Sequence, residues 1–238
     1  MNLPVSERLL ACCGFIPPKA RVADIGCDHG YLGIYLLKNS IASSVIAADV
    51  NEAPLQSAIR NAEKFDVRKQ MTFYLSDGFR NIPRDFDVAV CAGMGADTMV
   101  SILEAAPWLK ADRYRLILQC QSKTPMLRQY LSDNGWQIAA ETVLRDGRFL
   151  YTVMEVLYQP DSPRLCADQY YFPPVLLEHP TPELPEYYQR IVFSLRRAVA
   201  GQKDAAKPDM VRALQELEAL AEDENLQWLK EEQHDDRS

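Results

Sequence analysis

The chain has 238 residues, of which 47% are hydrophobic and 25% are charged, as in an ordinary globular protein. A chain of this length can bury enough surface to fold without a disulfide or a structural metal. No run approaches the ~20 consecutive apolar residues of a membrane span, and Glu7 and Arg8 interrupt the stretch where a signal peptide would be apolar. We therefore expect a soluble, cytoplasmic protein with no membrane partner.

The formal net charge of −7 is unevenly distributed along the chain. Residues 216–238 contain 2 basic and 9 acidic side chains, so this acidic tail accounts for the whole imbalance. In contrast, residues 187–212 contain six basic side chains and two acidic ones. Two interpretations of this basic stretch remain open, a solvated helix face and a surface that contacts phosphates.

The six cysteines show no C-x-x-C spacing, and the three histidines do not cluster with them. We therefore expect no metal site. Reduced thiols in a reducing compartment fit this pattern best, with Cys91 and Cys120 as small core residues in apolar strands.

Strand-like apolar runs alternate with helical patterns over the first 134 residues. The predicted strands are Arg21–Ile25, Ser44–Asp49, Met71–Ser76, Val88–Ala92 and Arg115–Gln119. The predicted helices are Ser6–Cys13, Tyr31–Lys38, Ala53–Phe65, Ala96–Glu104 and Pro125–Asn134. This alternation predicts βαβ units, hence an α/β protein with a parallel, doubly wound sheet.

Two long strands follow, Trp136–Leu144 and Phe149–Tyr158, joined by a turn at 145–148 that contains Asp-Gly. A mostly parallel, Rossmann-like sheet of seven strands that ends in a β-hairpin is typical of class I methyltransferases. Residues 159–186 are proline-rich and predict an ordered or semi-ordered linker.

Beyond the linker, apolar residues at helical spacing from Tyr188 to Val199 predict one helix, with Gly201 as its stop. Pro208 begins a second helix, so the two would form an antiparallel pair or coiled coil. The predicted domains are residues 1–158, catalytic, and residues 159–238, the linker with a helical domain.

The first predicted strand runs into Asp24-Ile25-Gly26-Cys27-Asp28-His29-Gly30, which then opens a helix. Glycine allows a close backbone approach to a ligand, and the helix N-terminus offers free N–H groups. Dinucleotide binding is disfavoured, because Asp28 stands where the NAD fingerprint requires its second glycine. Asp24 and Asp28 instead suit a ligand with ammonium and sulfonium charges, which is S-adenosylmethionine.

Two further acidic residues follow the next strands, Asp49 and Asp77, the latter before Gly78. Asp49 could accept hydrogen bonds from the ribose hydroxyls, and Asp77 could accept one from the adenine amino group. Each alone is more often a turn or cap residue. Three acids at the carboxyl ends of three successive strands nevertheless converge on the ligand crevice of an open α/β sheet.

The fourth strand runs into Cys91-Ala92-Gly93-Met94-Gly95-Ala96. Its glycines would let the backbone lie close to the transferred methyl group and the incoming base, although a tight strand-to-helix turn would use them equally. The chain has no [DNS]-P-P-[YFW] motif for exocyclic amines and no Pro-Cys nucleophile for pyrimidine C5. An endocyclic nitrogen remains a natural target.

These residues resemble the bacterial tRNA (adenine-22-N1)-methyltransferase family, TrmK. The resemblance rests on Arg8-Leu9, the block Asp24 to Leu32, Asp49, Pro54-Leu55, Asp77-Gly78, Ala92 to Gly95 and Leu116 to Gln119, with a weaker match at Tyr171 to Pro174. It implies S-adenosylmethionine as donor and N1 of adenine 22 of tRNA as acceptor. The expected donor-binding residues are Arg8, Asp24, Gly26, Cys27, Gly30, Asp49, Val50, Asp77, Gly78, Gly93 and Met94.

N1 of adenine can attack the methyl group directly with its in-plane lone pair, and the product base is cationic. A carboxylate would stabilise that charge, so Asp28 and then His29 are the catalytic candidates. The target base must be unstacked from the folded tRNA. The residues expected to contact tRNA are Tyr31, Gln119, Arg145, Arg148, Arg196 and Arg197.

The sequence departs from the family pattern at Gly30, Gly33, Ala96 and Cys120-Gln121. Cys120-Gln121 lies nearest the expected substrate pocket and affects base contacts more than the reaction. Two alternatives remain, a class I methyltransferase of another substrate and a non-catalytic RNA-binding protein that retains a donor site. We expect a monomer or a weak homo-oligomer.

Overall fold

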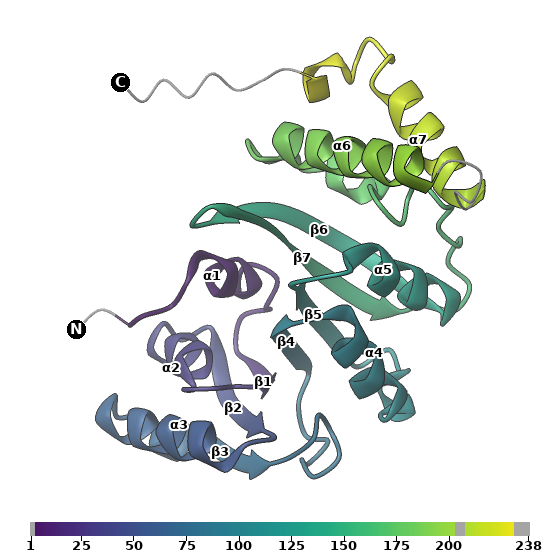
Figure 1. Cartoon of the computed structure of the whole chain (residues 1–238). Coiled ribbons are helices and arrows are strands. Elements are labelled where there is room, and N and C mark those ends of the chain that lie inside the picture. The colour runs from purple at the N-terminus through teal and green to yellow at the C-terminus, as the bar shows by residue number, and fades with distance from the viewer. Residues whose placement is uncertain (1–2, 203–207, 231–238) are drawn as a thin grey trace, which may run out of the picture.

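The computed structural model describes residues 3–202 and 208–230. A sheet of seven strands forms the centre of the larger lobe, in the order β3-β2-β1-β4-β5-β7-β6 (Figure 1). The strands are β1 (Ala20–Ile25), β2 (Ala42–Asp49), β3 (Met71–Leu75), β4 (Val88–Met94), β5 (Arg115–Cys120), β6 (Trp136–Asp146) and β7 (Phe149–Tyr158). Strands β1 to β5 run parallel, whereas β7 is antiparallel to both β5 and β6. The predicted α/β fold with a terminal hairpin is confirmed.

Helices cover both faces of this sheet because its strands are apolar on both sides. Helices α1 (Glu7–Cys13), α2 (Tyr31–Lys38) and α3 (Glu52–Lys64) share one buried apolar cluster with the sheet. Helices α4 (Ala96–Glu104) and α5 (Thr124–Asp133) share a second cluster on the opposite face. Short 3₁₀ segments connect some elements, namely η1 (Arg68–Gln70), η2 (Pro107–Leu109), η3 (Pro174–Leu177) and η5 (Gln227–Lys230).

The hairpin turn is tighter than predicted. Strand β6 continues through Arg145 to Asp146, which pairs with Phe149, so the loop contains only Gly147 and Arg148. Gly147 has a φ of 59°, which is the left-handed conformation that a two-residue hairpin loop requires. Asp146 is therefore the last residue of the strand and does not belong to the turn.

The C-terminal part is a second lobe above the hairpin in Figure 1. Helix α6 (Leu184–Gln202) starts before the predicted residue Tyr188 and includes Gly201, which does not stop it. Helix α7 (Pro208–Leu220) begins at the predicted proline and runs back along α6. The Tyr188 hydroxyl near the start of α6 donates a hydrogen bond to the carbonyl of Leu217 near the end of α7, at 2.6 Å. The predicted antiparallel arrangement of the pair is thus correct.

Residues 159–186, predicted to be an ordered or semi-ordered linker, also contribute side chains to the core of the second lobe. Phe172 and Leu176 are buried, and they share an apolar cluster with residues of both helices and with Val143 of β6. The proline-rich segment therefore helps to build the core of the second lobe. The domain boundary at residue 158 stays a prediction, although β7 ends there.

The two faces of the hairpin contact different parts of the molecule. Val143 packs into the second lobe, whereas its neighbour Leu144 packs on the side of α1 and α2. Side chains alternate between faces along a strand, so Arg145 points to the second lobe and Asp146 to the α1 side. Their ion pairs agree with this, since Arg145 pairs with Glu186 of α6 and Asp146 pairs with Arg8 of α1.

Candidate active site

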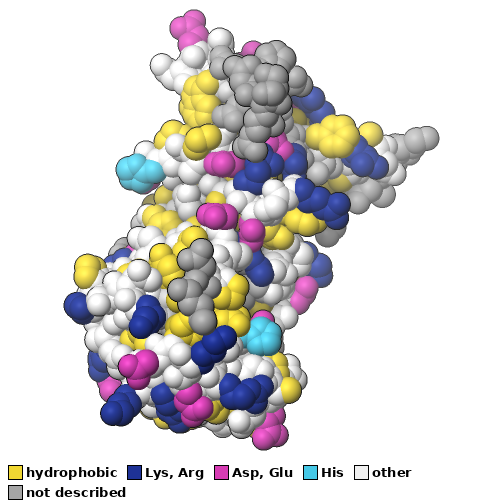
Figure 2. All heavy atoms as spheres, turned by 90° about the vertical axis from the view of Figure 1, so that its left-hand side faces the viewer, with side chains coloured by type: hydrophobic (Ala, Val, Ile, Leu, Met, Phe, Trp, Pro, Cys, Tyr) yellow, Lys and Arg dark blue, Asp and Glu magenta, His cyan; other side chains and the backbone are white. Residues whose placement is uncertain are grey.

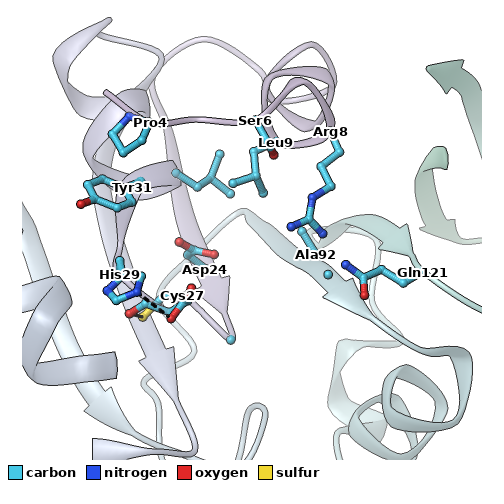
Figure 3. A pocket seen from close by; sticks show the side chains of 14 residues that line it. Pro4, Ser6, Arg8, Leu9, Asp24, Cys27, His29, Tyr31, Ala92 and Gln121 are labelled. Atoms are coloured by element: carbon cyan, nitrogen blue, oxygen red, sulfur yellow. Dashed lines mark hydrogen bonds and ion pairs between the residues drawn. The ribbon is translucent and has the colours of Figure 1, made fainter. Parts of the chain in front are cut away.

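A cavity of about 420 Å³ lies at the carboxyl ends of β1 and β4. Its wall combines the loop after β1, the start of α2, the end of β4 and, from above, residues 4–9 at the start of α1 (Figure 3). The carboxyl ends of parallel strands are where open α/β sheets bind their ligands. The position of the cavity thus agrees with the crevice expected from the sequence.

The loop after β1 is held by backbone hydrogen bonds. The amides of Gly26 and Cys27 both donate to the Ala48 carbonyl, at 2.8 and 2.9 Å. The amide of Asp28 donates to Oδ2 of Asp49, at 3.1 Å. Neighbouring β2 therefore fixes the shape of the loop, and Asp28 adopts a φ of 49°, in the left-handed region that side chains rarely occupy.

Two glycines of this loop have positive φ and close neighbours. At Gly26 (φ 74°) an added Cβ would overlap the end of the Met94 side chain. At Gly30 (φ 73°) it would lie 2.9 Å from the Cβ of Ala58 on α3. The positive φ disfavours a side chain at both positions, and at Gly30 the space beside Ala58 disfavours it as well, whereas the Met94 methyl group near Gly26 could move aside.

Asp24, the last residue but one of β1, lines the cavity floor while only 4% of it is exposed. Its Oδ2 atom is buried and accepts no hydrogen bond from any residue that the structure describes. Burial raises the pKa of this carboxyl to about 7, an effect that the Gly33 amide opposes and the negative charge of Asp49 reinforces. An unpaired buried carboxylate of this kind is costly unless a cationic group binds to it.

Asp28 and His29 lie side by side at the cavity wall. Asp28 Oδ1 is 3.6 Å from His29 Nε2, and the two side chains are 70% and 52% exposed. The His29 ring centroid is 6.0 Å from that of Tyr31, which also lines the cavity. The side chains of the two catalytic candidates are thus accessible to a substrate, as general acid–base or electrostatic catalysis requires.

Arg8 reaches from α1 to the opposite end of the cavity, above Ala92 (Figure 3). Its Nη1 donates to Gln119 Oε1 at 3.5 Å, and its Nε lies 3.4 Å from Asp146 Oδ2. Gln119 Oε1 also accepts the amide of Gly93 at 3.0 Å, and its Nε2 donates to the Cys120 carbonyl. Gln119 is fully buried, so it positions Arg8 and Gly93 without lining the cavity.

The cavity brings together eight of the residues expected from the sequence. They are Arg8, Asp24, Gly26, Cys27, Asp28, His29, Tyr31 and Gly93. The remaining donor-site candidates lie outside its wall: Gly30, Asp49, Val50, Asp77, Gly78 and Met94. Asp49 accepts the amides of Asp28 and Asn51, so its carboxylate shapes the loop. Asp77 is exposed and forms an ion pair with Arg80 at 3.1 Å.

Six residues of the wall were not predicted. They are Pro4, Ser6, Leu9, Leu32, Ala92 and Gln121. The sequence indicated a helix near Ser6 and Leu9 but not that it would cover the crevice, since this depends on tertiary packing. The Oγ atom of Ser6 is buried and makes no hydrogen bond within the described residues. The sequence did give a signal for Gln121, because Cys120-Gln121 is one of the positions at which it departs from the family pattern.

Two of the four arginines expected to contact RNA already have carboxylate partners. Arg145 pairs with Glu186, and Arg196 Nε lies 2.6 Å from Oε1 of Glu218. On the face shown in Figure 2, basic and acidic side chains are accordingly interspersed over both lobes. Two lysines of the basic stretch, at positions 203 and 207, lie outside the described residues. The expected surplus of positive charge is therefore smaller on the helices that the structure describes.

Two of these arginines instead lie over exposed aromatic rings. The Arg148 guanidinium is 4.9 Å from the centroid of Phe149, and that of Arg197 is 5.8 Å from the centroid of Phe193. Neither of the two forms an ion pair with a described residue. Among the residues that the structure describes, Arg148 at the hairpin turn and Arg197 on α6 are thus without a carboxylate partner.

The cysteines near the cavity are unreactive in this structure. Burial raises the pKa of the thiols of Cys12, Cys27 and Cys91, so each is neutral at physiological pH. Within residues 3–202 and 208–230, no three His, Cys, Asp or Glu side chains are grouped to hold a metal ion. No helix in the same ranges is long and apolar enough to span a membrane.

Comparison with known proteins agrees with this architecture. A family model described as a methyltransferase domain matches residues 5–154. The tRNA (adenine(22)-N(1))-methyltransferase of Bacillus subtilis is 33% identical over 154 residues, which are 64% of this chain and 65% of that protein. The matched stretch covers 61% to 65% of the length of the first curated relatives.

Solved structures match over a longer range. The B. subtilis tRNA methyltransferase TrmK superposes with a TM-score of 0.76 and 25% identity, covering 96% of this chain and 98% of that one. A Streptococcus pneumoniae structure solved in complex with S-adenosyl-L-methionine gives a TM-score of 0.78 and 30% identity, covering 90% of this chain and 99% of that one. With its seven-stranded sheet and its matched domain, the chain belongs to the methyltransferase-domain family.

Proposed function

We propose that this protein transfers the methyl group of S-adenosylmethionine to N1 of the adenine at position 22 of tRNA. The observation that carries the proposal is the unpaired, buried carboxylate of Asp24 in a cavity at the carboxyl end of β1. Similarity to the B. subtilis tRNA (adenine(22)-N(1))-methyltransferase supplies the acceptor. Similarity to the S. pneumoniae complex supplies the donor.

The residues of the cavity fit the charged end of this donor. The ammonium group needs acceptors, and Asp24 Oδ2 and Ser6 Oγ are buried polar atoms of the wall without partners among the described residues. The carboxylate needs a cation, and Arg8 is the arginine of the wall. The donor's two charges would thus meet groups of opposite charge in one cavity.

The nucleoside end of the donor would extend past the loop toward β2 and β3. Asp49 lies where β2 ends, and each of its oxygens accepts one amide and keeps a second lone pair for a ribose hydroxyl. Val50 is 62% exposed and Leu75 is 52% exposed, so these two side chains offer apolar contact to the adenine ring. Asp77 would accept the adenine amino group after leaving its exposed ion pair with Arg80.

When bound, the donor supplies an activated methyl group on a sulfonium. The chain's own residues then have three tasks. Gly93 keeps the end of β4 open for the incoming base, because a Cβ at this position would lie 3.3 Å from Nη1 of Arg8. Tyr31 offers a surface on which the unstacked adenine can lie. The Asp28 carboxylate, oriented by His29 at 3.6 Å, stabilises the positive charge that develops on the methylated base.

The second lobe and the hairpin would hold the rest of the tRNA. Arg148 and Arg197 have no carboxylate partner among the described residues, so both can contact phosphates. Arg145 and Arg196 could also contact phosphates, but only if each first breaks its ion pair with a carboxylate. We further propose that residues 1–158 form the catalytic domain and that the protein works in the cytoplasm as a monomer or a weak homo-oligomer.

The test is methyl transfer from labelled S-adenosylmethionine to two unmodified tRNA transcripts that differ only in having A or G at position 22. Label on the A transcript alone is the expected result. Label on both transcripts would contradict the assigned position. Absence of label from both would exclude the tRNA activity, and calorimetry with the donor would then show whether the cavity still binds it.

A further inference from the structure

The hairpin turn carries an aromatic pair, exposed Phe149 and half-buried Tyr151, for which the reaction described above has no use. Phe149, the first residue of β7, is 49% exposed. Arg148 lies over its ring at 4.9 Å, and the ring of Tyr151 lies 6.2 Å away at an angle of 55°. Neighbouring aromatic side chains at the surface, next to a cation, can mark an interaction site.

The cluster lies on the same side of the hairpin as the cavity. Phe149 is paired directly with Asp146 of β6, and side chains of directly paired residues share a face. The Asp146 carboxylate reaches Arg8 at 3.4 Å, and Arg8 lines the cavity. Tyr151 follows Phe149 by two residues and therefore also lies on this face. The aromatic cluster is thus on the cavity side of the hairpin, and Asp146, the residue paired with Phe149, contacts Arg8 of the cavity wall.

The opposite face of the hairpin shows that this placement is specific. Arg145 and Leu150 point to the second lobe, where Arg145 pairs with Glu186 and Leu150 packs near Ile191 of α6. That face is covered within the chain. On the face with Phe149 and Tyr151, Leu144 packs on the side of α1 and Asp146 pairs with Arg8, yet Phe149, which is directly paired with Asp146, remains 49% exposed.

The charge beside the rings is also uncompensated. Arg190, Arg196 and Arg212 of the two long helices each pair with a carboxylate, as Arg145 does. Arg148 makes no ion pair with a described residue. An aromatic ring with a free guanidinium beside it suits a nucleic acid, because a base stacks on the ring while the cation attracts the phosphate.

We propose that Phe149, Tyr151 and Arg148 form a stacking platform for an unpaired nucleobase next to the target adenine. The inference rests on the proposed tRNA methyltransferase activity and extends it to a second base. When the target base is extruded into the cavity, its neighbour loses a stacking partner. The Phe149 ring, which lies on the cavity side of the hairpin, replaces that partner and so lowers the cost of extrusion.

The experiment uses the full-length protein and tRNA transcripts with 2-aminopurine in place of the nucleotide that flanks the target, on either side in turn. Stacking on an aromatic ring quenches the fluorescence of this base analogue. The variants are Phe149→Ala, Phe149→Trp, which keeps an aromatic ring, and Phe193→Ala, which removes a similarly exposed ring above which Arg197 lies on α6.

We expect wild type, Phe149→Trp and Phe193→Ala to quench one of the two labelled transcripts at saturating protein, and Phe149→Ala to leave it bright. Loss of one base stack should lower kcat/KM for tRNA by about tenfold in Phe149→Ala while the dissociation constant for the donor stays at its wild-type value. Phe149→Trp should restore kcat/KM, which a merely structural loss would not predict.

Three results would overturn the platform. One is wild-type kcat/KM and quenching in Phe149→Ala, which would mean that no base stacks there. Another is equal losses in Phe149→Ala and Phe193→Ala, since the rings would then act as a general surface, such as a protein docking site. The third is a weakened donor affinity in Phe149→Ala. If wild type methylates no tRNA, the proposed function fails, and if it also quenches neither labelled transcript, the platform fails with it.

Discussion

The guanidinium of Arg128 and the carboxylate of Glu141 form a two-point ion pair inside the protein. Nε lies 3.1 Å from Oε2 and Nη2 lies 2.6 Å from Oε1, with both side chains fully buried. Arg128 also donates to the carbonyls of Tyr170 and Tyr171 and to the hydroxyl of Tyr187. One side chain of α5 therefore uses all five of its N–H groups to join the catalytic sheet to the second lobe.

Removing one partner of this pair should destabilise the protein strongly. Arg128→Met leaves the Glu141 carboxylate buried and unpaired, which costs about 3–5 kcal/mol. Chemical denaturation gives the free energy of unfolding. The matched control is Lys123→Met, which breaks the exposed Lys123–Asp97 pair at 2.8 Å and should cost less than about 1 kcal/mol. Similar costs for the two variants would contradict a special role of the buried pair.

Donor affinity should depend on pH through Asp24. The carboxyl has a pKa of about 7 in the free protein, because burial disfavours its charge. A cationic ammonium binds the ionised form, so affinity should fall about tenfold for each pH unit below 7 and level off above it. Calorimetry with S-adenosylmethionine between about pH 5 and pH 8 measures this. Asp24→Asn should bind weakly with no such slope; an unchanged slope would assign the titration to another group.

The same carboxyl should lower the stability of the free protein at neutral pH. The folded protein holds the Asp24 proton up to about pH 7, whereas the unfolded chain loses it near pH 3.8, the ordinary pKa of an aspartate. Stability contributed by this proton is present below that lower pKa and is lost as the pH rises through about 7. Without bound donor, the Asp24→Asn variant should thus be more stable than wild type at pH 8, by a few kcal/mol at most. Near pH 4 the variant and wild type should be equally stable. Thermal unfolding without donor at both pH values tests the difference.

Gly30→Ala should cost more stability than Gly147→Ala. Both glycines have positive φ, of 73° and 59°, so each substitution pays about 1 kcal/mol for the left-handed backbone. At Gly30 the new methyl group also meets Ala58 at 2.9 Å, whereas at Gly147 nothing lies within 4 Å. We expect about 2–3 kcal/mol for Gly30→Ala and weaker donor binding, because the loop must move. Equal unfolding free energies for the two variants would show that α3 can move away from the new methyl group at no measurable cost.

Arg197→Ala should weaken tRNA binding and reduce its dependence on salt. An unpaired arginine that contacts a phosphate contributes about one unit to the slope of log K against log salt. Filter binding at several salt concentrations measures that slope. The control is the double variant Arg196→Ala/Glu218→Ala, which removes an ion pair at 2.6 Å and leaves the net charge unchanged. If the double variant loses as much slope as Arg197→Ala, the paired arginine also reaches the tRNA.

Local sequence signals predicted most of the sheet and its helices. Helices α2 and α4 start and end at the predicted residues, since a glycine precedes each of them and the apolar spacing is regular. Strand β4 was predicted to end at Ala92 but continues to Met94, where it pairs with Cys120 after an irregularity. Glycine is a poor strand former, so only the pairing with β5 could reveal this extension.

The candidate site was predictable where it follows the chain and not where it depends on packing. Most of the segment from Asp24 to Tyr31 lines the cavity, because it leads directly from the end of β1 into α2. Gln119 was expected to contact tRNA, yet its amide is buried beneath Arg8 and Gly93, which lie 111 and 26 residues away along the chain. Contacts at such separations have no local signal. The same reason explains why the sequence did not indicate that Ser6 covers the crevice.

The position of β1 in the sheet sets an order for folding during synthesis. Val22 pairs with Val45 on one side and with Val88 on the other, so the centre of the sheet joins segments that are far apart in the chain. At a synthesis rate of about 5–20 residues per second, the nascent chain must wait several seconds between these two pairings. The loop after β1 therefore emerges from the ribosome well before β4, which forms the other side of the cavity. The wall also includes Gln121, which follows β5, so the cavity is complete only after β5 has been made. Until then the loop after β1 is held by its hydrogen bonds to β2.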